Sequence, residues 1–243
     1  MEWRDEGLVI GARRHGETSV ILELMTRGRG RWLGLVRGGL SRTMRPVLQP
    51  GNRVDATWRA RLEDHLGAFV VEPLAARAAR FLDHGFALHG LAHLSALLRL
   101  LPERDPHEEL YIVADAIADR LDALDYAPAL MARFELDLLA ALGFGLDLRA
   151  CALTGARAGL AYVSPKSGRA VTRAAGEPWR DRLLAYPAFL RDEAAPAPAG
   201  GDLSDAFRLT GHFLARDVLA PRGAALPAAR ALYIGAVVLR AGA

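Results

Sequence analysis

The sequence has few of the residues from which cofactor sites are usually built. Cys151 is its only cysteine, which excludes an intrachain disulfide and a zinc site made of several thiolates. A single cysteine is also typical of a reducing compartment. Lysine is equally scarce, because Lys166 is the only lysine among 31 basic residues. Nearly all of the positive charge is therefore carried by guanidinium groups.

Signals for membranes and for catalysis are missing as well. No apolar run approaches the ~18 residues that cross a bilayer, and no apolar stretch of a secretory signal follows the charged start MEWRDEG. The chain contains no GxSxG, GxxxxGKS/T, GxGxxG or HExxH motif. Hydrophobic residues make up 51% of the chain, enough for a folded core. These observations predict a soluble, cytoplasmic, folded protein that is not an enzyme.

The positive charge is concentrated in one part of the chain. Between Arg27 and Arg61 there are nine arginines and one acid, Asp55, whereas the whole chain has a net charge of only +3. Such segregation is typical of a surface that binds a polyanion. A general preference for arginine is the alternative interpretation. It explains why arginine replaces lysine, but it does not explain why acids are missing from this window.

Residues 1–73 have the pattern of a small β domain. Five short apolar or alternating segments are separated by turns rich in glycine and proline; they cover residues 7–12, 18–25, 31–37, 52–59 and 66–71. Their spacing of about ten residues predicts a small antiparallel barrel or sandwich, and the turn at Gly30 predicts a hairpin. Trp32 and Trp58 fall on these strands. They are candidates for stacking on nucleic-acid bases, with burial in the core as the alternative.

The apolar period changes to that of helices after Glu72-Pro73. Helices are predicted over residues 74–101, 107–124, 128–142, 202–219 and 227–239, and a hairpin over residues 160–164 and 170–173. The fold class is therefore α+β, with a barrel at residues 1–73 and a helical domain at residues 74–243. Residues 145–200 form an irregular insertion in that domain, and AAPAPAGG at 194–201 is a low-complexity linker or loop.

Several segments resemble the RecO family of DNA repair proteins. They are GETSVILELMT from Gly16, GRWLGLVRGG from Gly30, LQPG from Leu48, RFELDLLAALGFGLDL from Arg133, LAYVSPKSGRAV from Leu160 and LAYPAFL from Leu184. No single motif is decisive, but their order and spacing are specific, and they cover nearly the whole chain.

The resemblance implies an OB-fold joined to an α-helical domain. It also implies a nucleoid-associated recombination mediator that binds single- and double-stranded DNA and anneals complementary strands. The implied partners are the C-terminal tail of single-stranded-DNA-binding protein, RecR and, indirectly, RecA. Many relatives carry Cys-x-x-Cys at the start of a zinc knot, but here Thr154 stands in the second position. We therefore expect no zinc and no other cofactor, and Cys151 as a buried small apolar residue.

The predicted site consists of guanidinium groups, which bind phosphates bidentately and stay charged at any relevant pH. The DNA-binding candidates are Arg27, Arg29, Arg31, Arg37, Arg42, Arg45, Arg59, Arg61, Trp32 and Trp58. The loop from Gly38 to Arg45 is the strongest single element, with a solvated surface loop as the alternative. Arg133 is the partner-binding candidate, because it starts the helix on which the family binds the partner's tail. A salt bridge to Asp137 is its alternative.

Two further patterns suggest metal ligands. His84, His89 and His93 lie close together, and Asp115, Asp119 and Asp122 recur at helical spacing, but structural histidines and a solvated acidic face are the favoured interpretations. Two other functions remain open. A protein-interaction scaffold predicts partner binding that survives charge reversal at Arg37, Arg42 and Arg45. A hydrolase predicts a pocket with carboxylates or histidine of shifted pKa.

Overall fold

The computed structural model describes residues 1–192, 195 and 197–241 of the chain. Two compact units divide it, Met1–Asp122 and Ala123–Ala243. Each unit is described by itself below. In the part of the chain that the structure describes, no helix combines the length and apolarity needed to cross a membrane.

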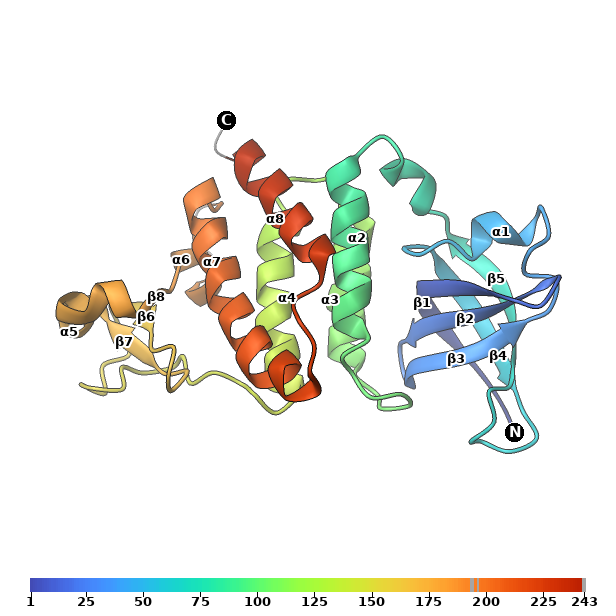
Figure 1. Cartoon of the computed structure of the whole chain (residues 1–243), viewed down its shortest axis with the longest axis horizontal. Helices are drawn as coiled ribbons and strands as arrows, with labels where there is room; N and C mark the ends of the chain where they lie inside the picture. The colour runs from blue at the N-terminus through green and yellow to red at the C-terminus, as the bar shows by residue number, and fades with distance from the viewer. Residues whose placement is uncertain (193–194, 196, 242–243) are drawn as a thin grey trace. The chain divides into compact units, whose positions relative to one another are not determined.

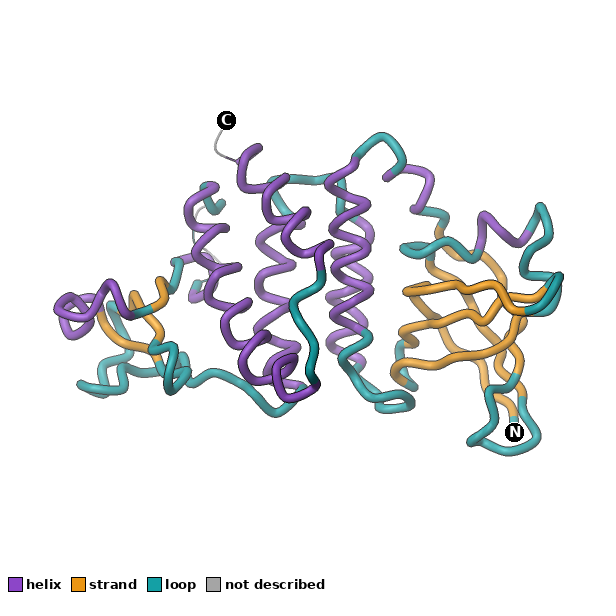
Figure 2. Tube along the Cα trace, viewed as in Figure 1, coloured by secondary structure: helices purple, strands orange, loops and turns teal. Residues whose placement is uncertain are grey.

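The first unit begins with five strands that close into a barrel (Figures 1 and 2). The strands are β1 (Glu2–His15), β2 (Ser19–Thr26), β3 (Gly30–Val36), β4 (Arg53–Arg59) and β5 (Ala68–Ala75). Their order around the barrel is β1-β2-β3-β5-β4, and all neighbours are antiparallel except β3 and β5. This confirms the predicted α+β class and gives the OB-like barrel that the family resemblance implies.

One irregularity lets β1 serve two neighbours. Its first half pairs with β4 and its second half with β2, and the register shifts between Val9 and Gly11. Such a bulge bends a strand and increases its twist, which helps a small sheet to close. The β2–β3 turn has its own constraint at Gly30, where φ is +72° and a Cβ atom would lie 1.9 Å from the Asp105 carbonyl oxygen. Only glycine fits this position.

The helices of the first unit start later than the sequence predicts. A 3-10 turn at Ala78–Phe81 precedes α2 (Gly85–Leu98), and α3 (Glu108–Asp119) follows. The prediction of one helix over residues 74–101 is wrong because β5 continues to Ala75 and the Asn52 side chain accepts hydrogen bonds from the backbone N–H groups of Arg77 and Ala78. A short helix, α1 (Met44–Val47), was not predicted.

The second unit contains three long helices and a small sheet. The helices are α4 (Ala127–Ala141), α7 (Gly200–Phe213), which continues as a π-helical turn to Leu219, and α8 (Ala228–Ala241). The sheet consists of β6 (Leu160–Val163), β7 (Ala170–Thr172) and β8 (Leu184–Ala185), in the order β7-β6-β8. Short helices α5 (Arg173–Gly176) and α6 (Ala188–Arg191) flank it. The predicted hairpin is confirmed. The predicted loop at 194–201 is wrong at its end, because Gly200 and Gly201 already belong to α7; residues 194 and 196 lie outside the described residues.

A buried ion pair joins the three long helices of the second unit. The Arg230 guanidinium of α8 donates to both carboxylate oxygens of Glu135 in α4, at 2.8 and 2.9 Å. It also donates to the Thr210 hydroxyl and to the Phe207 carbonyl, both in α7. The Glu135 side chain is 0% exposed and that of Arg230 is 8% exposed. Because both charges are desolvated, each depends on the other to stay in the core.

We predict that Arg230→Met lowers the free energy of unfolding by about 3–5 kcal/mol, because it leaves the Glu135 carboxylate buried without its cation. The double variant Glu135→Leu, Arg230→Met is expected to lose less than this single variant. Arg169→Met is the matched control, because Arg169 pairs with Asp147 at an exposed site and should change stability by only about 0–1 kcal/mol. Urea denaturation followed by circular dichroism measures all three, and equal losses at Arg230 and Arg169 would contradict the prediction.

Candidate nucleic-acid interface

The arginines of the basic window divide into two groups at opposite ends of the barrel strands. The first group lies where β2 ends, β3 begins and β4 begins, and acids of the first unit pair with three of its members. Arg27 pairs with Glu108 at 2.9 Å. Arg31 pairs with Glu23 at 2.8 Å and Glu103 at 3.5 Å, and Arg53 pairs with Asp115 at 3.1 Å; these acids lie on β2, before α3 and on α3.

These contacts correct part of the predicted DNA site. The Arg31 side chain is only 15% exposed and is already bound to two carboxylates, so it is not available to a phosphate. Arg27 is exposed but shares its charge with Glu108. Arg59 is also exposed and pairs with Glu2 at 2.9 Å. A linear count of charges therefore overstates the positive charge that the barrel presents.

The second group of arginines lies at the other end of the same strands. Leu40 donates a backbone hydrogen bond to the Thr18 carbonyl, and Leu35 donates one to the Gly67 carbonyl. The first bond joins the loops at residues 16–18 and 37–43, and the second places the loop at residues 60–67 beside the end of β3. We call the arginines around these loops the distal rim, and they are Arg13, Arg14, Arg37, Arg42, Arg45 and Arg61.

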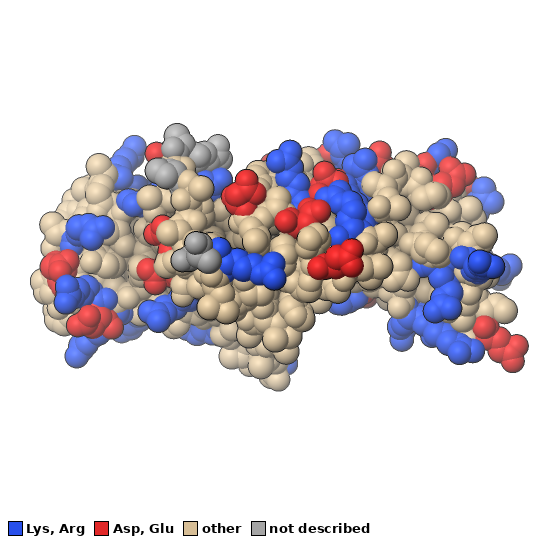
Figure 3. All heavy atoms as spheres, turned by 90° about the horizontal axis from the view of Figure 1, so that it is seen from above, with Lys and Arg blue, Asp and Glu red and all other residues tan. Residues whose placement is uncertain are grey.

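The side chains of the distal rim have little internal compensation. Arg14 donates to the Gly16 carbonyl oxygen, and among the described residues no ion pair forms at any of the six arginines. The acids of the three loops are Glu17, Glu63 and Asp64, half as many as the arginines. Figure 3 shows basic side chains gathered over the barrel, at the right of that view. The sequence prediction missed Arg13 and Arg14 because they precede the dense window and join it only through strand pairing.

The two candidate stacking residues belong to the barrel core. Trp32 is 3% exposed and Trp58 is 1% exposed, and their ring centroids lie 4.7 Å apart. Their indole N–H groups donate to the backbone carbonyls of Arg29 and Leu66. Trp3 stacks on Trp58 at 5.8 Å. The expectation that either residue stacks on bases is therefore wrong, and the core alternative holds.

The cations nearest these rings also have local roles. The Arg29 guanidinium carbon lies 5.3 Å from the centre of the Trp3 ring, and that of Arg104 lies 4.6 Å from the centre of the Trp32 ring. Such cation–π contacts hold a guanidinium group over the aromatic cluster. No acid among the described residues pairs with Arg29, so its charge is not offset, but it lies outside the distal rim.

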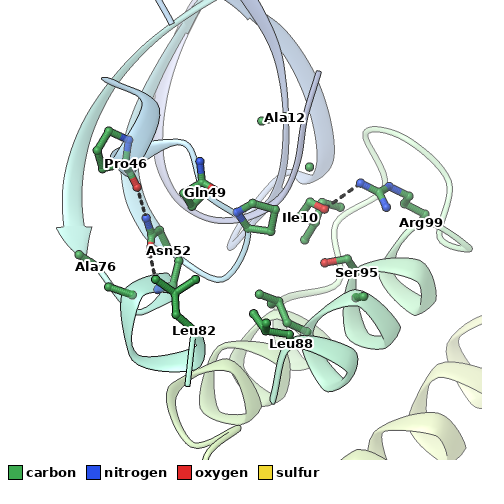
Figure 4. A pocket seen from close by; sticks show the side chains of 16 residues that line it. Ile10, Ala12, Pro46, Gln49, Asn52, Ala76, Leu82, Leu88, Ser95 and Arg99 are labelled. Atoms are coloured by element: carbon green, nitrogen blue, oxygen red, sulfur yellow. Dashed lines mark hydrogen bonds between the residues drawn. The ribbon is translucent and has the colours of Figure 1, made fainter. Parts of the chain in front are cut away.

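A groove of about 730 Å³ separates the barrel from α2 within the first unit (Figure 4). Its apolar lining includes Ile10, Leu82 and Leu88. Its only charged residue is Arg99, which donates to the Ile10 carbonyl at 2.7 Å and to Glu23 at 2.7 Å. Because this guanidinium is already neutralised, the groove does not suit an anion.

The aspartates on and just after α3 form ion pairs with arginines. Asp115 of α3 binds Arg77 at 2.6 Å as well as Arg53, and Asp119 of α3 binds Arg77 at 3.0 Å. Asp122, three residues after α3, binds Arg80 at 3.0 Å. The pairs with Arg77 and Arg80 tie this region to the segment after β5. Burial acts to lower the pKa of Arg77, but Asp115 and Asp119 outweigh burial and raise it. The expectation of a merely solvated acidic face is therefore wrong.

The histidines of α2 do not assemble a metal site. His93 is fully buried, and the His84 ring lies 5.7 Å from that of Phe86. Across the described ranges, no three His, Cys, Asp or Glu side chains are grouped so that they could hold a metal ion. The donors needed for the zinc knot of some relatives are not brought together either, so the residues present do not fit that metal.

Arg133 lies at a small pocket of the second unit. Its guanidinium donates two hydrogen bonds to the Phe189 carbonyl oxygen, one of them at 3.1 Å. Neither of these two bonds goes to Asp137, which the sequence suggests as a salt-bridge partner of Arg133. The pocket has a volume of about 250 Å³, and its lining includes Tyr126, Leu130 and Phe189. A guanidinium beside apolar and aromatic walls is suited to a carboxylate that carries an aromatic neighbour.

Cys151 is buried as expected, but its surroundings are polar. Its Sγ accepts a hydrogen bond from the Thr172 backbone N–H at 3.3 Å. Burial acts to raise the pKa of the Cys151 thiol, but hydrogen bonds from the Thr154 hydroxyl and from backbone N–H groups outweigh it and lower the pKa to about 6. The expectation of a simple apolar residue is thus incomplete.

The strand order and the basic rim place the first unit in the class of OB-fold barrels, which commonly hold oligonucleotides or oligosaccharides. The comparison with known proteins is more specific. The family model described as "Recombination protein O N terminal" matches residues 1–76, and "Recombination protein O C terminal" matches residues 83–224. The chain belongs to the recombination protein O family.

Named relatives agree with this assignment. The chain is 62% identical over 238 residues to the DNA repair protein RecO of Methylobacterium nodulans, covering 96% of this chain and 97% of that protein. It is 58% identical over 240 residues to the protein of the same name from Rhodopseudomonas palustris, covering 98% and 96%. These findings support a role in DNA repair and recombination. The family models meet between residues 76 and 83, whereas the first compact unit extends to Asp122, so the predicted domain boundary after residue 73 stays a prediction.

We predict that Cys151 titrates with a midpoint near pH 6, because hydrogen bonds lower its pKa to about 6. Below that pH the thiol is protonated. Thr154→Val removes a hydrogen bond to the thiolate and should move the midpoint to higher pH. The ultraviolet absorbance of the thiolate, measured against pH, suits this buried side chain because it needs no reagent to reach the sulfur, and Cys151→Ala supplies the background. A midpoint that does not move in the Thr154 variant contradicts this account.

Proposed function

We propose that this protein binds single- and double-stranded DNA through the distal rim and acts as a non-enzymatic recombination mediator that anneals complementary strands. The observation that carries the proposal is a set of six arginines at one end of an OB-like barrel, none of them in an ion pair among the described residues. At the other end, by contrast, Arg27, Arg31 and Arg53 are bound to acids, which are Glu23, Glu103, Glu108 and Asp115.

The proposed mechanism is electrostatic. Guanidinium groups of the rim bind phosphates bidentately, and such contacts position a strand without reading its sequence. The loop after β3 adds the hydroxyls of Ser41 and Thr43, whose oxygens lie 3.3 Å apart. When arginines neutralise the phosphates of two strands, the repulsion between the strands falls and base pairing can begin. Displaced counterions then make the affinity depend steeply on salt.

Partner binding is assigned to the second unit. We propose that the pocket at Arg133 receives the C-terminal tail of single-stranded-DNA-binding protein, with the guanidinium on the terminal carboxylate and an aromatic side chain among Tyr126, Leu130 and Phe189. The tail would bring the mediator to coated single strands. Cooperation with RecR and assistance to RecA loading complete the proposal, and they are supported by membership of the family.

We predict that the triple variant Arg37→Glu, Arg42→Glu, Arg45→Glu binds oligothymidylate at least tenfold more weakly and anneals complementary strands correspondingly more slowly. If the three arginines contact phosphates, the slope of log affinity against log salt should become shallower by about 2, because each phosphate contact on a single strand contributes about 0.7 to that slope. Fluorescence anisotropy at several salt concentrations and a strand-annealing assay measure the two effects.

The matched control is Lys166→Glu, Arg173→Glu, Arg208→Glu, which changes the net charge equally and lies in the second unit. These three side chains are exposed. The control should retain most of the affinity. A wild-type affinity that does not respond to salt, or equal losses in both triple variants, counts against a DNA site at the rim and favours the scaffold alternative.

We also predict that Arg133→Ala weakens the binding of an acidic peptide with a C-terminal phenylalanine by at least tenfold, since a charged hydrogen bond contributes about 1.5–3 kcal/mol. Arg133→Lys should keep part of the affinity, because the charge remains but the fork is lost. Isothermal titration calorimetry with the free-acid and C-terminally amidated peptides checks the role of the carboxylate. If amidation has no effect on wild-type binding, Arg133 does not recognise the terminal carboxylate.

A further inference from the structure

The insertion of the second unit contains a cavity whose charged side chains are all arginines. The cavity has a volume of about 650 Å³ and is lined by Leu148, Arg149, Arg157, Ala158, Gly159, Leu160, Tyr186 and Arg191. No acidic residue is part of this lining. It is distinct from the Arg133 pocket, with which it shares no lining residue.

Local structure positions one of the three guanidinium groups. Arg191 ends α6 and donates a hydrogen bond to the Leu160 carbonyl oxygen at the start of β6. Its guanidinium carbon also lies 5.7 Å from the centre of the Tyr186 ring. The carbonyl and the ring hold this side chain in the lining of the cavity without neutralising its charge.

The other two arginines have no internal partner. Arg149 and Arg157 are exposed, and neither forms an ion pair or hydrogen bond with any residue that the structure describes. Two acids of the insertion are engaged elsewhere: Asp147 pairs with Arg169, and Glu177 pairs with Arg180. The cavity therefore gathers three positive charges, and no acid that the structure describes is part of its lining.

The walls of the cavity favour a phosphate over a peptide. Leu160 and Tyr186 are each only 6% exposed, so they enclose the cavity but offer little apolar surface to a ligand. An aromatic-ended acidic peptide needs such a surface, and the Arg133 pocket is better suited to it. Guanidinium forks match the tetrahedral oxygens of a phosphate. The volume exceeds that of one phosphate group, which leaves room for a short stretch of sugar-phosphate backbone.

We propose that the cavity formed by Arg149, Arg157 and Arg191 binds the phosphodiester backbone of DNA and is a second DNA contact, separate from the distal rim. The proposal deepens the proposed function and rests on it for the identity of the ligand. Each unit then carries its own phosphate site, so one protein can hold two strands, or two parts of one strand, irrespective of how the units are placed.

The test uses the full chain and starts from the barrel variant Arg37→Glu, Arg42→Glu, Arg45→Glu. The DNA affinity that remains in this variant measures binding at sites other than these three arginines. Adding Arg149→Glu and Arg157→Glu should lower the residual affinity for oligothymidylate at least fivefold. The slope of log affinity against log salt should become shallower by about 1.4, because each of the two lost phosphate contacts contributes about 0.7. The matched addition is Lys166→Glu with Arg173→Glu, which lies in the same insertion but outside the lining and should change the affinity less than twofold.

Folding is not expected to confound the comparison, because Arg149 and Arg157 are exposed and unpaired in the described chain; equal thermal unfolding midpoints verify this. Equal losses from the cavity pair and the control pair overturn the proposal. The two proposals fail separately. If the barrel triple variant binds DNA as tightly as wild type, the rim proposal fails, while the cavity is still judged by the effect of its own pair.

The source of the phosphate is tested with inorganic tripolyphosphate as a competitor. A site for a DNA strand is supported if tripolyphosphate displaces the DNA only at a much higher concentration of phosphate groups than an unlabelled oligonucleotide needs. Equal potency per phosphate group overturns the DNA part and leaves a site for free phosphate. Loss of acidic-peptide binding in the cavity pair, with DNA binding unchanged, also overturns the proposal.

Discussion

The charge distribution of the first unit depends on ion pairs between barrel arginines and acids distant in sequence. Glu103, Glu108 and Asp115 lie 50 or more residues after the arginines that they neutralise, and together with Glu23 they cover one end of the barrel. Most of these pairs are partly exposed and contribute only about 0–1 kcal/mol each to stability. Their main consequence is electrostatic, because they leave the distal rim as the strongly positive end of the barrel.

Much of the fold could be predicted from the sequence because its signals are local. Alternation and glycine turns identified all five barrel strands, and Pro128 marked the start of α4. The segment after β5 was misjudged because its course depends on Asn52, 25 residues earlier, which accepts hydrogen bonds from Arg77 and Ala78. Neither the amino-acid composition nor the spacing of apolar residues can reveal a hydrogen bond between positions so far apart in the sequence.

The candidate site was only partly predictable, for two different physical reasons. Arg31 was misassigned because its two acidic partners reach it only in the folded chain: Glu23 from the neighbouring strand β2 and Glu103 from the segment before α3. Trp32, however, was within reach of a stricter argument: in β3 every second residue from Gly30 to Val36 is buried, and Trp32 is one of them. The same period places Trp58 with Val54 and Ala56. The stacking hypothesis gave weight to residue type where the strand period already specified direction.

Burial of the tryptophans bears on the proposed annealing. Stacking of a base on an exposed aromatic contributes about 1–3 kcal/mol, comparable to the mean of about 1.4 kcal/mol for one base-pair step in a duplex. A barrel that stacked bases on its rings would therefore compete with the pairing that it is proposed to promote. Trp32 and Trp58 instead pack against each other and Trp3, while the rim offers guanidinium groups. Contacts made to phosphates leave the base edges free, so a strand held at the rim can pair with its complement without first leaving the protein.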